Sequence, residues 1–177
     1  MKQAYPLTVR RQLGHDWVTL FDLVLDVERY PLFIPGCTDD RVLSRRVVSP
    51  GRDEIVSRMT VGRPPLQFSY TNRTLADRET RRIGVASTDG PLRLLNVLWR
   101  FMPSGTSRTD IAFTACYEFR SAIVGGLAAG VLETLFGRIV EAFETRADAL
   151  AHNGQTAARA RAAPFVRPRP EGLSKQL

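Results

Sequence analysis

The sequence predicts an α+β fold in which a curved, seven-stranded antiparallel sheet surrounds one long C-terminal helix. Between residues 39 and 119, apolar residues alternate with polar ones, and clusters of turn residues separate the alternating runs. Apolar residues then recur at helical spacing to about residue 150, and no helical pattern interrupts the strands, which excludes parallel βαβ units. The composition, 44% hydrophobic and 24% charged over 177 residues, is that of one soluble globular domain.

The N-terminal part predicts one strand followed by two short helical segments. Residues 5–11 read as a strand, and Asp16 then marks a helix entry, because the helix dipole favours a carboxylate in the first turn. The apolar face of this short helix recurs at three- and four-residue spacing: Trp17, Leu20, Phe21, Val24 and Val27. Residues 30–36, YPLFIPG, follow as a compact helical turn punctuated by two prolines.

Six further strands complete the predicted sheet. Turn clusters separate them at short intervals: residues 49–51, 62–65, 76–78, 89–91 and 103–105. Strands of this length with short polar connections describe an antiparallel meander. Such a sheet has one apolar face, and the C-terminal helix carries the one large apolar stripe available to cover it. A strongly twisted sheet that curls around this helix is the simplest architecture that buries both.

The predicted C-terminal helix has about thirty residues, which corresponds to roughly 45 Å at 1.5 Å per residue. Its first half is almost entirely apolar and contains Gly125, Gly126 and Gly130. Small residues facing the sheet would leave volume for an apolar ligand, whereas close backbone packing or a kink would explain them without one. We place the globular domain at residues 1–152 and expect the proline- and arginine-rich tail, residues 153–177, to be disordered.

The formal charge of +7 is distributed unevenly. Residues 1–150 carry only +3, which is weak support for a nucleic-acid surface, so we expect no DNA partner. Two cysteines and two histidines, scattered along the chain, support neither a disulfide framework nor a metal site. The N-terminus lacks the apolar core of a secretory signal, and the uncharged residues 121–132 are too few to span a bilayer. We therefore expect a cytoplasmic protein, with contact to one side of a membrane left open.

Three stretches of the sequence follow a known pattern. They are residues 20–37 with the motif DVERYP-x-F-x-P-x-C, residues 68–101 with FSYTNR, GPL and WRF, and residues 117–143 beginning YEFRS. Together they span about residues 4–150 and resemble the coenzyme Q-binding (Coq-type) family of START-like proteins, which includes bacterial RatA-type ribosome-association proteins. The family often has tryptophan where this chain has Gly36. If that tryptophan closes the mouth of the pocket, the mouth is wider here.

The resemblance implies the helix-grip fold (START-like, Bet v-like) of the polyketide cyclase/dehydrase and lipid transport superfamily. Such domains hold a hydrophobic molecule between the concave face of the sheet and the long helix. In this family the molecule is ubiquinone or a polyprenyl intermediate, which is bound as cargo and not as a catalytic cofactor. The implied role is that of a quinone chaperone for respiration and ubiquinone synthesis, with no catalytic residues and with peripheral contact to the inner membrane.

The expected ligand-binding residues line a hydrophobic cavity. They are Phe33, Ile34, Phe68, Tyr70, Trp99, Phe101, Phe113, Tyr117, Leu127, Val131 and Leu135. Aromatic residues at period two are also ordinary core, so the strand aromatics form either a packed interior or a wall for the quinone ring. In the wall, the Tyr117 hydroxyl would donate to a quinone carbonyl. The proline-bracketed turn at Phe33 and Ile34 forms either a plug on the core or an apolar tip that gates the pocket or enters a bilayer surface.

Two other functions stay open at this point. A RatA-type regulator would bind the large ribosomal subunit and block subunit joining, which would require a basic exposed face. A cyclase or aromatase of the polyketide type would require an acid and a base that converge in the pocket. The sequence shows no such pair, so we expect a binding protein and not an enzyme.

Overall fold

The computed structural model describes residues 7–121 and 135–152. The N-terminal strand β1 (Leu7–Leu13) leads into helix α1 (Trp17–Leu25) and the short 3₁₀ helix η1 (Val27–Leu32). Six strands follow: β2 (Cys37–Ser49), β3 (Arg52–Arg63), β4 (Leu66–Asp77), β5 (Arg82–Ser87), β6 (Leu92–Pro103) and β7 (Thr109–Phe119). The described part of the C-terminal helix covers residues 135–152. The first half of that predicted helix and the predicted tail lie outside the described residues.

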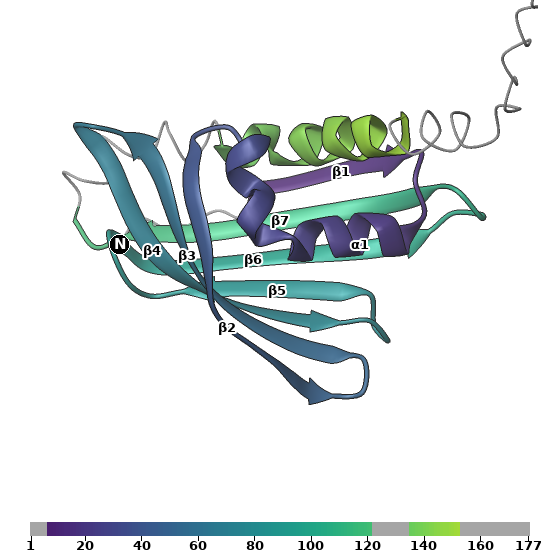
Figure 1. Cartoon of the computed structure of the whole chain (residues 1–177), viewed down its shortest axis with the longest axis horizontal. Coiled ribbons are helices and arrows are strands. Elements are labelled where there is room, and N and C mark those ends of the chain that lie inside the picture. Colours follow the sequence, from purple (N-terminus) through teal and green to yellow (C-terminus); the bar gives the residue numbers. More distant parts are fainter. Residues whose placement is uncertain (1–6, 122–134, 153–177) are drawn as a thin grey trace, which may run out of the picture.

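The seven strands form one antiparallel sheet, which confirms the predicted architecture. Their order is β1-β7-β6-β5-β4-β3-β2, so the first strand pairs with the last and every other neighbour in the sheet is a neighbour in sequence. Figure 1 shows that β2, β3 and β4 run at a steep angle to β6 and β7. The resulting curvature creates a concave face, against which α1 and the C-terminal helix pack through Phe21 and Phe143.

Helix α1 begins at a capped N-terminus and buries one face, as its spacing predicts. The Asp16 carboxylate accepts hydrogen bonds from the backbone amides of Val18 and Thr19, both at 3.0 Å. It also accepts one from the Thr19 hydroxyl at 2.6 Å, and these bonds lower the pKa of Asp16. Phe21 packs on Phe101 of β6. The buried residues of the helix are Leu20, Phe21, Leu23, Val24 and Leu25.

The turn before β6 explains why the pattern at residues 90–92 requires glycine. Gly90 has a φ of +60°, and a Cβ atom there would lie 2.3 Å from the Ser69 carbonyl oxygen. The preceding residue, Asp89, accepts a hydrogen bond from the backbone amide of Thr71 at 2.6 Å. The close approach of this turn to β4 therefore fixes one end of the concave face.

An aromatic core joins the C-terminal helix to the sheet and to η1. The Phe143 ring lies 5.1 Å from Trp99, 5.2 Å from Phe33 and 5.5 Å from Tyr30, measured between ring centroids. Trp99 in turn lies 4.7 Å from Phe113 on the neighbouring strand. Edge-to-face contacts of this kind stabilise an aromatic cluster beyond the area that it buries.

Candidate ligand-binding interior

The candidate site is the concave face of the sheet, which carries the alternate residues of its strands. On β6 and β7 the inward residues include Leu95, Trp99, Phe113 and Ala115, all of them buried. On β3 and β4 the same face continues with Ile55, Met59, Val61 and Tyr70. Since side chains alternate across a strand, the remaining residues of these strands point to the convex face.

Three of the predicted cavity residues lie within the aromatic core. Trp99, Phe101 and Phe113 are at most 3% exposed, and their rings contact other rings of the protein. Phe101 packs on Phe21 of α1 at 5.3 Å, and Phe113 packs on Phe136 of the C-terminal helix at 6.1 Å. In the described part of the chain these residues are therefore packed as core, and contact with a ligand stays a prediction.

Other predicted residues lie nearer the end of the face where β7 finishes. Tyr117 and Phe68 are only partly buried. The Tyr117 ring lies 5.5 Å from Phe136, and Phe68 stacks on the buried Tyr70 at 6.3 Å. Leu135 is buried at the start of the described helix, whereas Leu127 and Val131 lie outside the described residues.

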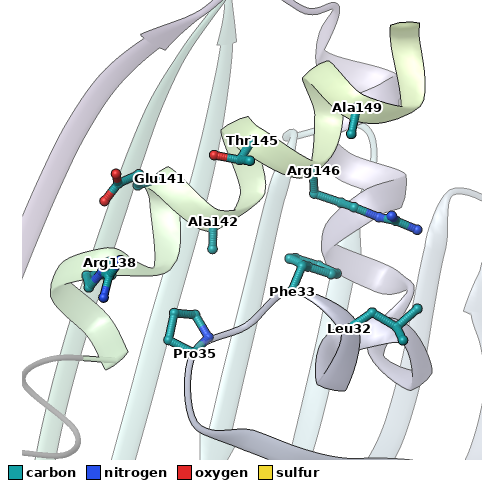
Figure 2. Close-up of a pocket in the computed structure, with 9 residues that line it drawn as sticks. All are labelled: Leu32, Phe33, Pro35, Arg138, Glu141, Ala142, Thr145, Arg146 and Ala149. Atoms are coloured by element: carbon teal, nitrogen blue, oxygen red, sulfur yellow. The ribbon is translucent and has the colours of Figure 1, made fainter. Parts of the chain in front are cut away.

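The proline-bracketed turn is divided between the core and the surface. Ile34 is buried and Phe33 packs against Phe143, as a plug on the core would, whereas Leu32 is 71% exposed. A surface groove of about 400 Å³ separates this turn from the C-terminal helix, which presents Ala142 and Arg146 toward it (Figure 2). Its lining combines apolar and charged residues: Leu32, Phe33, Pro35, Arg138, Glu141, Ala142, Thr145, Arg146 and Ala149.

A buried polar cluster on the concave face was missed by the sequence analysis. Asp40 on β2, Ser57 on β3 and Asn72 on β4 are 3%, 1% and 8% exposed. Both Asp40 carboxylate oxygens, the Ser57 hydroxyl and the Asn72 amide oxygen have no hydrogen-bond partner among the described residues. Ser57 and Asn72 fall in the same alternating series as the apolar residues that point inward on β3 and β4. This alternation could have predicted from the sequence that both side chains are buried.

The surroundings of Asp40 disfavour its negative charge. Burial is the main cause that raises the pKa of Asp40 to about 7, and the carboxylates of Asp39 and Glu28 raise it further. The Ser57 hydroxyl does not meet the geometry of a hydrogen bond to Asp40, but it lies close enough to the carboxylate to offset part of the rise. Burial also raises the pKa of the nearby Cys37 thiol to about 12, so this cysteine stays protonated, as a packing residue would.

The convex face of the sheet presents a row of arginines. Arg10 on β1 and Arg100 on β6 both pair in register with Ala112 on β7, and Arg100 pairs with Arg82 on β5. All three arginines are exposed, and none forms an ion pair with a described residue. The convex face is therefore locally basic, although the net charge of the globular part is small.

The described residues contain neither a cluster suited to a metal ion nor a helix that could span a membrane. Within residues 7–121 and 135–152, no group of three or more His, Cys, Asp or Glu residues could hold a metal ion. No helix of this same part is long and apolar enough to cross a membrane.

A curved antiparallel sheet that packs against a terminal helix defines the class of START-like, helix-grip domains. The family described as "polyketide cyclase / dehydrase and lipid transport" matches residues 14–144, and the chain belongs to it. This confirms the resemblance inferred from the sequence.

The solved structure of protein CC1736 from Caulobacter crescentus has a TM-score of 0.66 at 31% identity and covers 84% of this chain and 99% of that one. The solved structure of the Zhui aromatase/cyclase from Streptomyces sp. R1128 has a TM-score of 0.62 at 20% identity and covers 93% of this chain and 100% of that one. At this identity the similarity shows that the two proteins share a fold and nothing more.

Curated relatives carry two different names. "Ribosome association toxin RatA" of Rickettsia prowazekii is 29% identical over 131 residues, which cover 72% of this chain and 86% of the relative. "Coenzyme Q-binding protein COQ10 homolog B, mitochondrial" of Xenopus laevis is 28% identical over 139 residues, which cover 76% of this chain. The match spans 54% of that second, longer protein.

Proposed function

We propose that the protein binds an isoprenoid quinone, ubiquinone or a polyprenyl relative, between the concave face and the C-terminal helix, and carries it without converting it. The observation that carries this proposal is that the concave face combines partly accessible aromatic residues with buried polar atoms that lack partners. Small-molecule sites have this composition, an apolar lining with a few polar groups that orient the guest. A flat quinone ring would stack on the aromatic side chains, and its chain would lie along aliphatic ones.

Two further features support a carrier role. The chain is similar to a protein whose name describes coenzyme Q binding. The groove beside the exposed Leu32 includes Arg138 and Arg146 against one carboxylate, Glu141, and an apolar tip beside an excess of positive charge suits the surface of an anionic membrane. We therefore propose peripheral contact with the inner membrane through this turn, at which the quinone would enter or leave.

The direct test is a titration of the purified full chain with decylubiquinone, followed by tryptophan fluorescence. We expect saturable quenching, and we expect Tyr117→Leu to weaken binding about tenfold because it removes a ring from the partly accessible wall. Tyr117→Phe separates the contribution of the hydroxyl from that of the ring. Thr114→Val, on the convex side of the same strand, is the matched control and should bind like the parent. No saturable binding by the parent would contradict the proposal.

Ribosome association is a second candidate, which the arginine row on the convex face favours. Phosphate contacts by arginine give salt-dependent binding to RNA, and several relatives are named for ribosome association. If this function is present, the protein co-sediments with large ribosomal subunits at low salt. Arg82→Glu combined with Arg100→Glu should abolish the co-sedimentation and leave quinone binding unchanged. Co-sedimentation that is insensitive to both salt and these substitutions would contradict a role for this face.

A further inference from the structure

The buried polar cluster of Asp40, Ser57 and Asn72 occupies one place on the concave face. Ser57 and Asn72 are direct cross-strand partners on β3 and β4, and Ser57 also pairs with Val42, two residues beyond Asp40 on β2. Directly opposed side chains have Cβ atoms about 5 Å apart, and diagonal neighbours remain within reach of each other. Three adjacent strands therefore bring one carboxylate, one hydroxyl and one amide together in the interior.

The unpaired atoms of this cluster point to a missing binding partner. Buried polar side chains are nearly always hydrogen-bonded in folded proteins, to the protein, to water or to a ligand. Here four oxygen atoms of three residues, each more than nine-tenths buried, have no partner among the described residues. The neighbouring donors are already engaged with sulfur, because the Tyr70 hydroxyl donates to the Met59 Sδ at 3.3 Å and the Asn72 Nδ2 lies 3.8 Å from the same atom.

The chemistry of these atoms selects a guest that donates hydrogen bonds. An ionised carboxylate and an amide oxygen only accept, and among the four unpaired atoms the Ser57 hydroxyl is the one that also donates, while the donor of Asn72, its Nδ2, is directed at the Met59 Sδ. A quinone ring offers carbonyl oxygens, which accept, whereas the reduced hydroquinone ring offers two hydroxyls, which donate. Both forms have the same carbon skeleton and the same isoprenoid chain, so the apolar part of the site would hold them equally.

We propose that Asp40, Ser57 and Asn72 form an acceptor-rich head-group subsite, which makes the interior hold the reduced, hydroquinone form of its guest more tightly than the oxidised form. This inference rests on the proposed quinone-binding function and adds the redox form that the site prefers. A hydroxyl that donates to the ionised Asp40 would form a charge-assisted hydrogen bond, which is stronger than a neutral one.

The charge state of Asp40 adds a pH dependence to this preference. The groups whose charge acts on Asp40 are Asp39 and Glu28, and Asp40 itself acts on Cys37, Tyr30 and Tyr70. Because the pKa of Asp40 lies at about 7, its carboxylate is mostly ionised at about pH 8 and mostly protonated at about pH 6. The protonated acid can donate to a quinone carbonyl, so the preference for the hydroquinone should narrow at the lower pH.

The experiment compares decylubiquinone with chemically reduced decylubiquinol under anaerobic conditions, by tryptophan fluorescence at about pH 8. We expect the parent protein to bind the reduced form about tenfold more tightly. Asp40→Asn and Asn72→Leu should each reduce this ratio toward one while the oxidised form still binds. The matched controls are Asp39→Asn, an exposed carboxylate beside Asp40, and Asn96→Leu, an exposed amide on the convex face, and both should retain the ratio.

The outcomes separate this inference from the function on which it rests. If neither form binds to the parent, the proposed function fails and the subsite with it. If both forms bind equally to the parent, quinone binding stands and the head-group subsite is overturned. The subsite is also overturned if Asp40→Asn and Asn72→Leu both keep the tenfold preference for the reduced form. The same holds if the control Asp39→Asn loses this preference as fully as Asp40→Asn does. The comparison of redox forms on the parent protein needs no variant, so a variant that fails to fold does not obscure the result.

Discussion

Replacing Phe143 with alanine is expected to lower the free energy of unfolding by about 3–5 kcal/mol. The side chain is 2% exposed or less, and its ring contacts Trp99 on the sheet as well as Phe33 and Tyr30 on the turn segment. These contacts join the C-terminal helix to both of the surfaces that it covers. The alanine variant loses the transfer free energy of the ring and leaves a cavity between elements that cannot fully close around it.

Urea denaturation followed by tryptophan fluorescence measures this loss, since Trp99 reports on the same cluster. Phe143→Leu should lose clearly less, because it keeps most of the buried volume. Thr145→Ala, an exposed position on the same helix, should remain within about 0.5 kcal/mol of the parent. A loss below about 1 kcal/mol in Phe143→Ala would mean that the helix is held to the sheet mainly by other contacts.

The sheet and the first helix were predictable from the sequence because their signals are local. Period-two alternation and short turn clusters define an antiparallel meander without knowledge of any distant contact. The helical spacing of Leu20, Phe21 and Val24 likewise predicted the face that α1 buries. The end of the first strand was predicted less accurately: residues 5–11 were expected, whereas the strand continues to Leu13, because pairing with β7 and not composition sets its end. Residues 5 and 6 lie outside the described residues.

The inward position of Asp40 could not be predicted, because an irregularity in β2 changes its alternation. Counted in twos from the buried Cys37, the inward residue would be Asp39. The register shifts between Cys37 and Asp39, so Asp39 pairs with Thr60 and is exposed, while Asp40 pairs with Met59 and is buried. Pairing with β3 determines this shift, and no residue type in the segment indicates it.

The arginine row on the convex face depends on strand order in the same way. Arg10, Arg82 and Arg100 are far apart in sequence, and only the β1-β7-β6-β5 order brings them to one surface. A net charge counts residues without regard to which face they occupy. The small net charge of residues 1–150 was therefore poor evidence against a basic exposed face, because net charge does not show how the charged residues are distributed over the surface.

The buried Asp40 is expected to make the protein less stable as the pH rises from about 5 to about 8, by about 2–3 kcal/mol from this residue alone. Its pKa in the folded state is about 7, against about 3.9 for an aspartate in an unfolded chain. Between these values the folded protein binds a proton that the unfolded chain has released, so rising pH favours unfolding. The cost is complete once the pH exceeds the folded-state pKa.

Urea denaturation of the parent, Asp40→Asn and Asp39→Asn at both pH values isolates this contribution from that of the other titrating groups. Asparagine has nearly the same shape and no charge, so Asp40→Asn should gain about 2–3 kcal/mol relative to the parent between pH 5 and pH 8. Asp39→Asn removes an exposed carboxylate that adds to the raised pKa of Asp40, whereas burial, the main cause, remains, so this variant should keep most of the parent's loss of stability between the two pH values. Parallel pH profiles for Asp40→Asn and the parent would show that Asp40 is ionised in the folded protein throughout this range, with a partner or solvent that satisfies its charge.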